Sequence, residues 1–278
     1  MPRIAVCSWS LRPESPEDLI QKVRSCGLSA VQLWLDPIRS WTWKPDTMGG
    51  LARASGLTLV SGMFAPKDED YSTLESIRRT GGVRPDGTWE ANQKAAEGDA
   101  IMAARFGIPL VTFHAGFIPH DTSDPARGVM AQRLRQIAET MAARNVRVAL
   151  ETGQENAETL LQALAEVNES LPEKARVGVN FDPANMILYG MGDPIESLRR
   201  LLPHVLQVHI KDAIPAASKD AWGEEKPVGL GAVDWPAFFG VLRDAGYRGD
   251  LVIERESGDD RQADVRRARD LIEKHWKV

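Results

Sequence analysis

The sequence predicts an eight-stranded parallel α/β barrel formed by one domain over residues 1–278. Three observations favour this fold class. Short runs of apolar β-forming residues alternate with helical segments, eight such units can be counted, and the last four runs end in polar side chains. A chain of 278 residues is long enough for one (β/α)8 barrel, also called a TIM barrel. An open doubly wound sheet would need a Gly-rich phosphate turn after the first strand, and 8–12 contains no glycine.

Local signals set the expected boundaries of the strands and helices. Proline after serine or aspartate opens several helices, as at Ser15-Pro16 and Asp124-Pro125, and glycine ends others, as at Gly27 and Gly107. We expect strands at 4–9, 30–34, 57–63, 110–114, 146–151, 177–182, 206–212 and 251–254. We expect the main helices at 15–27, 45–55, 89–106, 124–144, 156–171, 193–202, 234–246 and 260–276.

Two long loops interrupt this alternation. Residues 64–88 contain glycine-rich turns, and a connection of this length in a compact domain is usually a lid or a binding loop. Within it, 71–79 is expected to form a short helix, and the acidic run 68–70 is expected to be a solvated part of the loop. The second loop, 212–233, is polar. We expect 64–88 to be a mobile gate with few packed side chains.

Composition and charge exclude several classes of partner. The chain is 43% hydrophobic and 26% charged, with a formal net charge of −5 and no basic block, so it lacks the surface that nucleic-acid binding requires. No run is long enough to cross a membrane, and the apolar run 4–7 is too short for a signal peptide. The two cysteines have no metal-type spacing. Disulfide scaffolds use many more cysteines, so a reducing, cytoplasmic location is expected. The sequence leaves both a monomer and a homo-oligomer open.

Acidic residues and a histidine occupy the ends of the last four predicted strands. Because side chains alternate across a strand, all four can point to the barrel axis while their neighbours form an apolar outer face. These residues are Glu151, Asp182, His209 and Glu254. Three carboxylates and an imidazole suit one divalent ion such as Mn²⁺, Zn²⁺, Co²⁺ or Mg²⁺, whose charge would offset the repulsion between the carboxylates. The alternative is that each residue is a strand-end polar group that bonds to a loop. The same feature on four consecutive strands argues against this alternative.

Other polar residues are candidates for binding a substrate beside this site. His114 ends the fourth strand on its inward side, and it either contacts substrate or metal or is packed against a loop carbonyl. Lys211 shares the face of His209, and it either polarises a substrate oxygen or pairs with Asp182 or Glu254. These alternatives remain open at this stage.

Aromatic residues cluster near the ends of the first two strands. Trp9, Trp34, Trp41 and Trp43 could form a wall against the C–H face of a sugar, although packing is the commoner role of any single tryptophan. Of the remaining histidines, we expect His204 and His275 to be structural, and His120 stays undecided.

Four short motifs at the strand ends resemble those of a known family. They are Leu-Glu-Thr-Gly at 150–153, Asn-Phe-Asp-Pro-Ala-Asn at 180–185, Val-His-Ile-Lys-Asp at 208–212 and Ile-Glu-Arg-Glu at 253–256, and 227–235 adds a further match. The chain thus resembles the sugar phosphate isomerase/epimerase family, the xylose-isomerase-like TIM barrels. The resemblance implies that the four strand-end residues hold one divalent metal ion. It also implies that Glu151 and Glu254 form an acid/base pair on opposite faces of the substrate, as in the family's ketose 3-epimerases.

The chain departs from the ketose 3-epimerases in two places. Those enzymes usually carry histidine three residues after the metal aspartate, where this chain has Asn185. They also carry arginine in the loop after the metal histidine, where 212–233 holds only Lys219 and Lys226 as basic residues. Asn185 most simply caps the turn after Pro183, and the resemblance places it near the metal and the substrate. The resemblance therefore implies the metal centre more directly than the sugar specificity.

These features predict a divalent-metal-dependent isomerase or epimerase of a small sugar or keto-sugar. Glu151 and Glu254 would remove and return a proton by way of an enediolate. The alternative is a metal-dependent lyase or dehydratase that acts on a keto-sugar or keto-inositol through the same enolate chemistry. An abasic-site endonuclease would need a basic groove and more histidines than the five of this chain. A sugar-binding module without activity would not need two carboxylates beside one metal ion.

Overall fold

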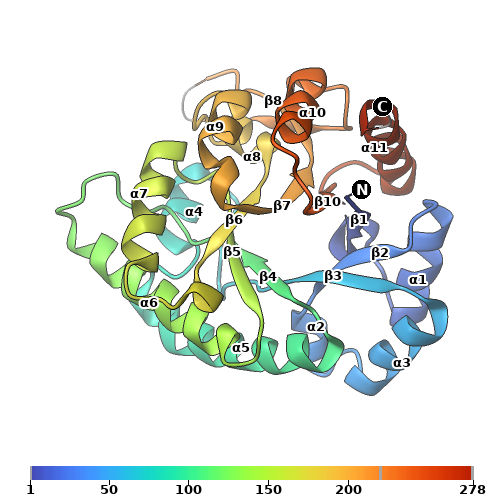
Figure 1. Cartoon of the computed structure of the whole chain (residues 1–278), viewed down its shortest axis with the longest axis horizontal. Helices are drawn as coiled ribbons and strands as arrows, with labels where there is room; N and C mark the ends of the chain where they lie inside the picture. Colours follow the sequence, from blue (N-terminus) through green and yellow to red (C-terminus); the bar gives the residue numbers. More distant parts are fainter. Residues whose placement is uncertain (1, 219–220, 277–278) are drawn as a thin grey trace.

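The computed structural model describes residues 2–218 and 221–276, and it shows the predicted closed barrel of parallel strands (Figure 1). Within these residues, eight strands pair in the order β1-β10-β7-β6-β5-β4-β3-β2. Their bounds are Ile4–Cys7 for β1, Ala30–Trp34 for β2, Thr58–Met63 for β3, Leu110–Phe113 for β4, Arg147–Glu151 for β5, Gly178–Phe181 for β6, Val205–Ile210 for β7 and Asp250–Ile253 for β10. The predicted fold class is therefore confirmed.

Helices surround the barrel on its outer side (Figure 1). They are α1 (Pro16–Ser25), α2 (Asp36–Arg39), α3 (Pro45–Ser55), α4 (Leu74–Thr80), α5 (Asp86–Phe106), α6 (Pro125–Ala142), α7 (Ala157–Asn168), α8 (Pro183–Leu188), α9 (Pro194–Leu201), α10 (Trp235–Asp244) and α11 (Arg261–Trp276), with 3-10 turns at Ser8–Leu11, Glu173–Ala175 and Leu202–His204. Side chains of Ser15, Asp124 and Asp193 accept N–H bonds at the starts of α1, α6 and α9, as the serine-proline and aspartate-proline pairs predicted. No helix in the described part of the chain combines the length and the apolar character needed to span a bilayer.

The two faces of the barrel strands differ in chemistry, and this difference positions the site. The outer face is apolar, and side chains such as those of Leu150, Phe181 and Ile210 are buried between the strands and the helices. On the inner face, a cluster of small or apolar residues forms one layer: Ala5, Cys7, Ala30, Val60 and Val252. Toward the C-terminal ends of the strands the inner face becomes polar, with buried Gln32, Thr112, Asn180 and Gln207. The barrel therefore places buried hydrogen-bonding side chains beneath the C-terminal ends of its strands.

The loop expected at 212–233 is ordered by one buried carboxylate. Part of it forms a two-stranded antiparallel sheet outside the barrel, β8 (Asp212–Ile214) and β9 (Glu224–Lys226), so the expectation of a loop throughout is wrong. A Cβ at Gly231 would lie 2.1 Å from Asp212 Oδ1, which explains the glycine there. Lys219 lies outside the described residues. The Asp212 carboxylate accepts hydrogen bonds from the backbone N–H groups of Ala213, Gly229, Gly231 and Val233 and from the indole of Trp235.

Segment 64–88 is anchored more firmly than expected. The side chains of Ile77 and Val83 are fully buried, and Val83 N donates to Ala115 O at 3.0 Å. Gly82 has φ +65°, and a Cβ there would lie 2.0 Å from the Ala115 oxygen. The expectation of few packed side chains is wrong for these residues. The expected short helix is present as α4, and the following helix, α5, begins within the segment rather than after it.

Residues 67–75 nevertheless lie mostly exposed between the buried parts of this segment. We predict that their amide hydrogens exchange faster than those of β4 and β5 in the free protein, because few buried contacts oppose local opening. Hydrogen–deuterium exchange followed by mass spectrometry measures this difference. Protection equal to that of β4 and β5 would show that the segment does not act as a gate.

We predict that Asp212→Ala lowers the free energy of unfolding by about 3 kcal/mol or more, because it leaves several buried N–H donors without an acceptor. Urea unfolding followed by circular dichroism measures the change. Asp234→Ala is the matched control, since the exposed Asp234 caps α10 through a single bond to Ala237 N and its loss should cost about 1 kcal/mol. Equal losses in the two variants would contradict the role assigned to Asp212.

Candidate metal centre and substrate cavity

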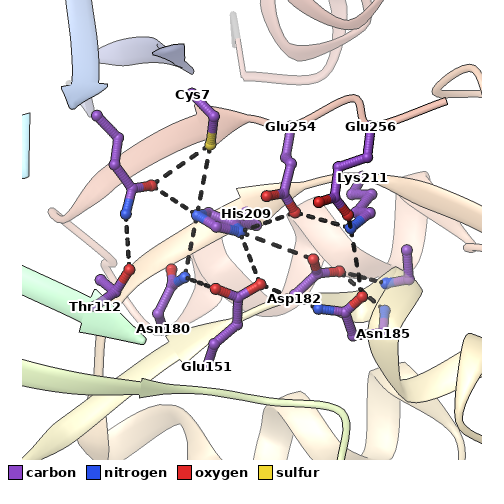
Figure 2. Close-up of polar contacts among 12 residues, drawn as sticks. Cys7, Thr112, Glu151, Asn180, Asp182, Asn185, His209, Lys211, Glu254 and Glu256 are labelled. Carbon is purple, nitrogen blue, oxygen red and sulfur yellow. Dashed lines mark hydrogen bonds and ion pairs between the residues drawn. The ribbon is translucent and has the colours of Figure 1, made fainter. Parts of the chain in front are cut away.

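Four ionisable side chains meet at the C-terminal ends of neighbouring barrel strands (Figure 2). Glu151 is the last residue of β5, His209 lies in β7, and Asp182 and Glu254 directly follow β6 and β10. These strands are adjacent in the order β5-β6-β7-β10. Each of the four residues is at most 3% exposed. The barrel thus brings together the set that the sequence predicted from the alternation of side chains.

The four side chains surround one small volume. His209 Nδ1 lies 3.3 Å from Glu151 Oε1, 3.4 Å from Glu254 Oε2 and 3.8 Å from Asp182 Oδ2. One ligand atom from each residue lies within 4.8 Å of those of the other three. Atoms at these separations can share a single cation.

Two buried atoms in this cluster have no hydrogen-bond partner in the part of the chain that the structure describes. They are His209 Nδ1 and Asp182 Oδ2, both of which face the shared volume. The other oxygen of Asp182 accepts from Ala184 N and Asn185 N and so caps α8. Buried polar atoms without a partner are rare in proteins and indicate that a ligand binds there. Three carboxylates and one imidazole, two of which carry an orphaned atom, therefore fit a single divalent ion.

The tautomer of His209 follows from the buried polar layer beneath it. His209 Nε2 lies 2.8 Å from Gln32 Oε1, which can only accept a hydrogen bond. The Gln32 amide is oriented in turn, because its nitrogen donates to Thr112 Oγ1 at 2.7 Å and its oxygen accepts from Gln207 at 3.1 Å. Asn180 Nδ2 lies farther from Nε2, at 3.1 Å. We therefore assign the proton of the neutral imidazole to Nε2, which would leave the lone pair of Nδ1 facing the carboxylates.

The electrostatics of the cluster also call for a cation. Burial by itself lowers the pKa of His209, but the nearby carboxylates, with Glu151 foremost, raise that pKa well above its ordinary value. Burial raises the pKa of Asp182, whose carboxylate faces those of Glu254 and Glu151. Without an ion, the positive charge beside these carboxylates comes from a protonated His209 and from Lys211. A divalent ion would supply the positive charge and leave the imidazole neutral.

Each of the two glutamates has its own orienting partners. Glu254 Oε1 accepts from the Trp9 indole N–H at 2.8 Å, and Glu254 Oε2 accepts from Lys211 Nζ at 3.0 Å. Glu151 Oε1 accepts from Asn185 Nδ2 at 3.0 Å. The carboxylates are therefore held from opposite ends of the four-residue row.

A cavity of about 460 Å³ opens onto the two glutamates, within the usual range for small-molecule sites. Its lining includes the four residues that the sequence suggested for substrate binding, namely Trp9, His114, Asn185 and Lys211. His114 Nε2 lies 3.6 Å from Glu151 Oε1, and its Nδ1 has no hydrogen-bond partner among the described residues. The alternative of a histidine bonded to a loop carbonyl is thus not observed.

Several sequence interpretations are refined by these contacts. The suggestion that Asn185 caps the turn after Pro183 is wrong, because Asp182 is the cap and Asn185 reaches Glu151 instead. Lys211 does pair with Glu254, and also with Glu256 (Figure 2).

Of the other aromatic and histidine candidates, some line the cavity and others have contacts elsewhere. Trp34 lines the cavity, whereas Trp41 is 66% exposed and Trp43 packs against the core. His120 bonds to Thr159 and His275 stacks on a phenylalanine, so both have structural contacts away from the cavity.

Sequence reasoning missed several residues of the site. Gln32 shares the inner face of β2 with Ala30 and Trp34, so the same alternation could have identified it. Glu69 was assigned to a solvated loop but lines the cavity. No local pattern indicated Tyr71, Tyr189 or Trp222, which also line it.

Comparison with solved structures shows the same fold over the whole chain. A xylose isomerase domain protein from Planctomyces limnophilus is 28% identical, with a TM-score of 0.84 over 99% of this chain and 97% of that one. The structure of D-allulose 3-epimerase from a Methylomonas species in complex with D-allulose is 15% identical, with a TM-score of 0.73 over 99% and 97% of the two chains. At that identity the second likeness shows the fold alone.

Comparison with curated proteins and with family models identifies the family. L-ribulose-5-phosphate 3-epimerase UlaE from Escherichia coli is 37% identical over 71 residues, which are 25% of this chain. The matched part is 23% of the length of that relative. The family model described as xylose isomerase-like TIM barrel matches residues 20–275. This chain therefore belongs to the xylose isomerase-like TIM barrel family.

Proposed function

We propose that this protein is a divalent-metal-dependent isomerase or epimerase of a small sugar or keto-sugar. The observation that carries the proposal is a pair of buried, separately oriented glutamates on either side of one predicted cation position, both facing a sugar-sized cavity. The family membership and the 3-epimerase names of the compared proteins support the same class of reaction.

Glu151, Asp182, His209 and Glu254 would hold the ion. When bound, the ion would supply positive charge that stabilises the enediolate of a hydroxy-ketone substrate. Asn180 and Gln32 contact Glu151 and His209 from below, at 3.3 Å and 2.8 Å, and would keep these ligands in place.

Glu151 and Glu254 would remove and return the substrate proton. Burial raises the pKa of each, but nearby cationic groups outweigh it: His209 and His114 lower the pKa of Glu151, and Lys211 and His209 lower that of Glu254 well below its usual range. Both carboxylates are therefore ionised near neutral pH without the ion, and a bound divalent ion would replace the positive charge of His209 and keep them available as bases. Inversion of a carbon requires a base on each face of a planar intermediate, and one fixed carboxylate cannot reach both.

The substrate would be positioned by the other polar residues of the cavity. His114 and Asn185 lie beside Glu151, where they can hydrogen-bond to substrate oxygens. Lys211 would fix the orientation of Glu254 and lie near a substrate oxygen. The Trp9 ring, whose indole already bonds Glu254, would contact the C–H face of the sugar.

We predict that Asp182→Ala abolishes tight binding of one divalent ion per chain, because it removes one of four ligands. Metal analysis of the dialysed protein, together with circular dichroism, measures occupancy and folding. Asp182→Asn is a second variant that keeps the helix cap on α8 but removes the charge, and it should also lose the ion. Asp193→Ala removes an equivalent cap on α9 and should keep it. Full metal occupancy in either Asp182 variant would refute the ligand set.

We predict that Glu151→Gln and Glu254→Gln each abolish inversion in protein saturated with metal. In deuterium oxide, the variant with one surviving base should still exchange the substrate proton on its own face without inversion. Nuclear magnetic resonance of a panel of ketoses measures both exchange and inversion, and it also reveals loss of water if the reaction is an elimination.

The exposed Glu90 provides the control, since Glu90→Gln makes the same change of charge at a position outside the cavity. Inversion by either active-site variant within about tenfold of the wild-type rate, or about 1.4 kcal/mol of barrier, would show that the two-base mechanism is wrong.

A further inference from the structure

Two carboxylates beyond the predicted metal ligands line the cavity. Glu69 is held within segment 64–88, where its Oε1 accepts from Gly82 N at 2.8 Å and its Oε2 accepts from the Tyr71 hydroxyl at 3.1 Å. Glu256 is half-exposed at the mouth, where it pairs with Lys211. Its backbone N–H donates to Glu225 Oε1 at 3.0 Å, which ties the end of β10 to β9. Both carboxylates therefore belong to the cavity wall in this structure, and each has a hydrogen-bonded partner.

Lys211, the lysine of the cavity lining, is already paired with neighbouring side chains. Lys211 Nζ has three donors, and its neighbours are Glu254 Oε2 at 3.0 Å, Glu256 Oε2 and Asn185 Oδ1 at 3.5 Å. No arginine is among the described residues that line the cavity. The backbone N–H of Gly82 donates to Glu69 Oε1, so it is not available to bind an anion. Among the described lining residues, a phosphate group would therefore find no arginine and no unpaired lysine, and the unpaired ring nitrogens are those of His114 and Trp222.

Carboxylates outnumber positive charges even when an ion is counted. A divalent ion and Lys211 would contribute three positive charges, and a charged His114 would make four, against five carboxylates: those of Glu69, Glu151, Asp182, Glu254 and Glu256. An added phosphate dianion would face this excess inside a partly enclosed site, where charges are weakly screened.

The remaining wall of the cavity is mainly aromatic, with Met63, Ala65 and Leu188 beside the rings. Tyr189 and Trp222 are in edge contact with ring centroids 5.0 Å apart, and Trp34 and Tyr71 continue the lining at positions 40% and 45% exposed. Trp222 Nε1 is buried without a hydrogen-bond partner among the described residues. Aromatic faces bury the C–H groups of a neutral sugar, and carboxylates accept hydrogen bonds from its hydroxyls.

We infer that the substrate is an uncharged, unphosphorylated sugar, and that Glu69 is a specificity-determining residue that accepts hydrogen bonds from its hydroxyls and excludes phosphate esters. This inference rests on the proposed function, because it describes the substrate of the same site. It separates this chain from the phosphosugar epimerase to which a quarter of it is similar.

The test compares matched pairs of sugars that differ only in a terminal phosphate. Isothermal titration calorimetry with Mn²⁺-saturated protein would use L-ribulose with L-ribulose 5-phosphate, and D-fructose with D-fructose 6-phosphate. We expect each ester to bind about tenfold or more weakly than its free sugar, because of the uncompensated carboxylates. Glu69→Gln keeps an acceptor for Gly82 N. It should lower the ratio of the ester's dissociation constant to that of the free sugar by about threefold or more.

The matched control is Glu90→Gln, which changes the net charge equally at an exposed position of α5 and should leave the ratio unchanged. Equal or tighter binding of either ester, an unchanged ratio in Glu69→Gln, or no binding of any of the four probes would overturn the inference. Binding of the free sugars without proton exchange would instead refute the proposed epimerase while leaving this inference intact.

Discussion

The burial of three carboxylates around a single imidazole is the constraint on which this site depends. Glu151, Asp182 and Glu254 each lie within 4 Å of His209 Nδ1, and each is at most 3% exposed. Like charges in such a place repel one another and lose their hydration, and both effects must be offset. The orphaned atoms of His209 and Asp182 mark where the offsetting charge belongs. The rest of the cavity is arranged around this need for a cation.

The polar layer inside the barrel gives the cluster its geometry. Gln32 accepts from the far nitrogen of His209 and is itself oriented by Thr112 and Gln207. This chain of bonds runs through side chains that point inward from rigid strands, so it fixes the imidazole without help from loops. Precise placement of a ligand shell usually requires such support from a second layer.

The loops add specificity to this rigid base. The Asp212 carboxylate accepts hydrogen bonds from N–H groups of the segment after β7. Glu225 on β9 accepts one from the backbone after β10. Segment 64–88 brings Glu69 to the cavity from the other side and keeps an exposed stretch at 67–75. The barrel therefore supplies the candidate metal centre, and the loops shape the cavity in front of it.

The sequence by itself determined the barrel and its four-residue cluster. Strand alternation has a period of two, and strand ends are visible as local changes in polarity, so Glu151, Asp182, His209 and Glu254 could be assigned to one mouth. Helix starts at serine-proline and aspartate-proline pairs were equally local. The tertiary structure decided the remainder, because it depends on contacts between distant residues. Gln32 and His209 are 177 residues apart, and Glu69 meets the cavity only after its segment folds back onto the barrel. No local pattern encodes such pairings, since each is set by how the closed sheet brings separate strands and loops together.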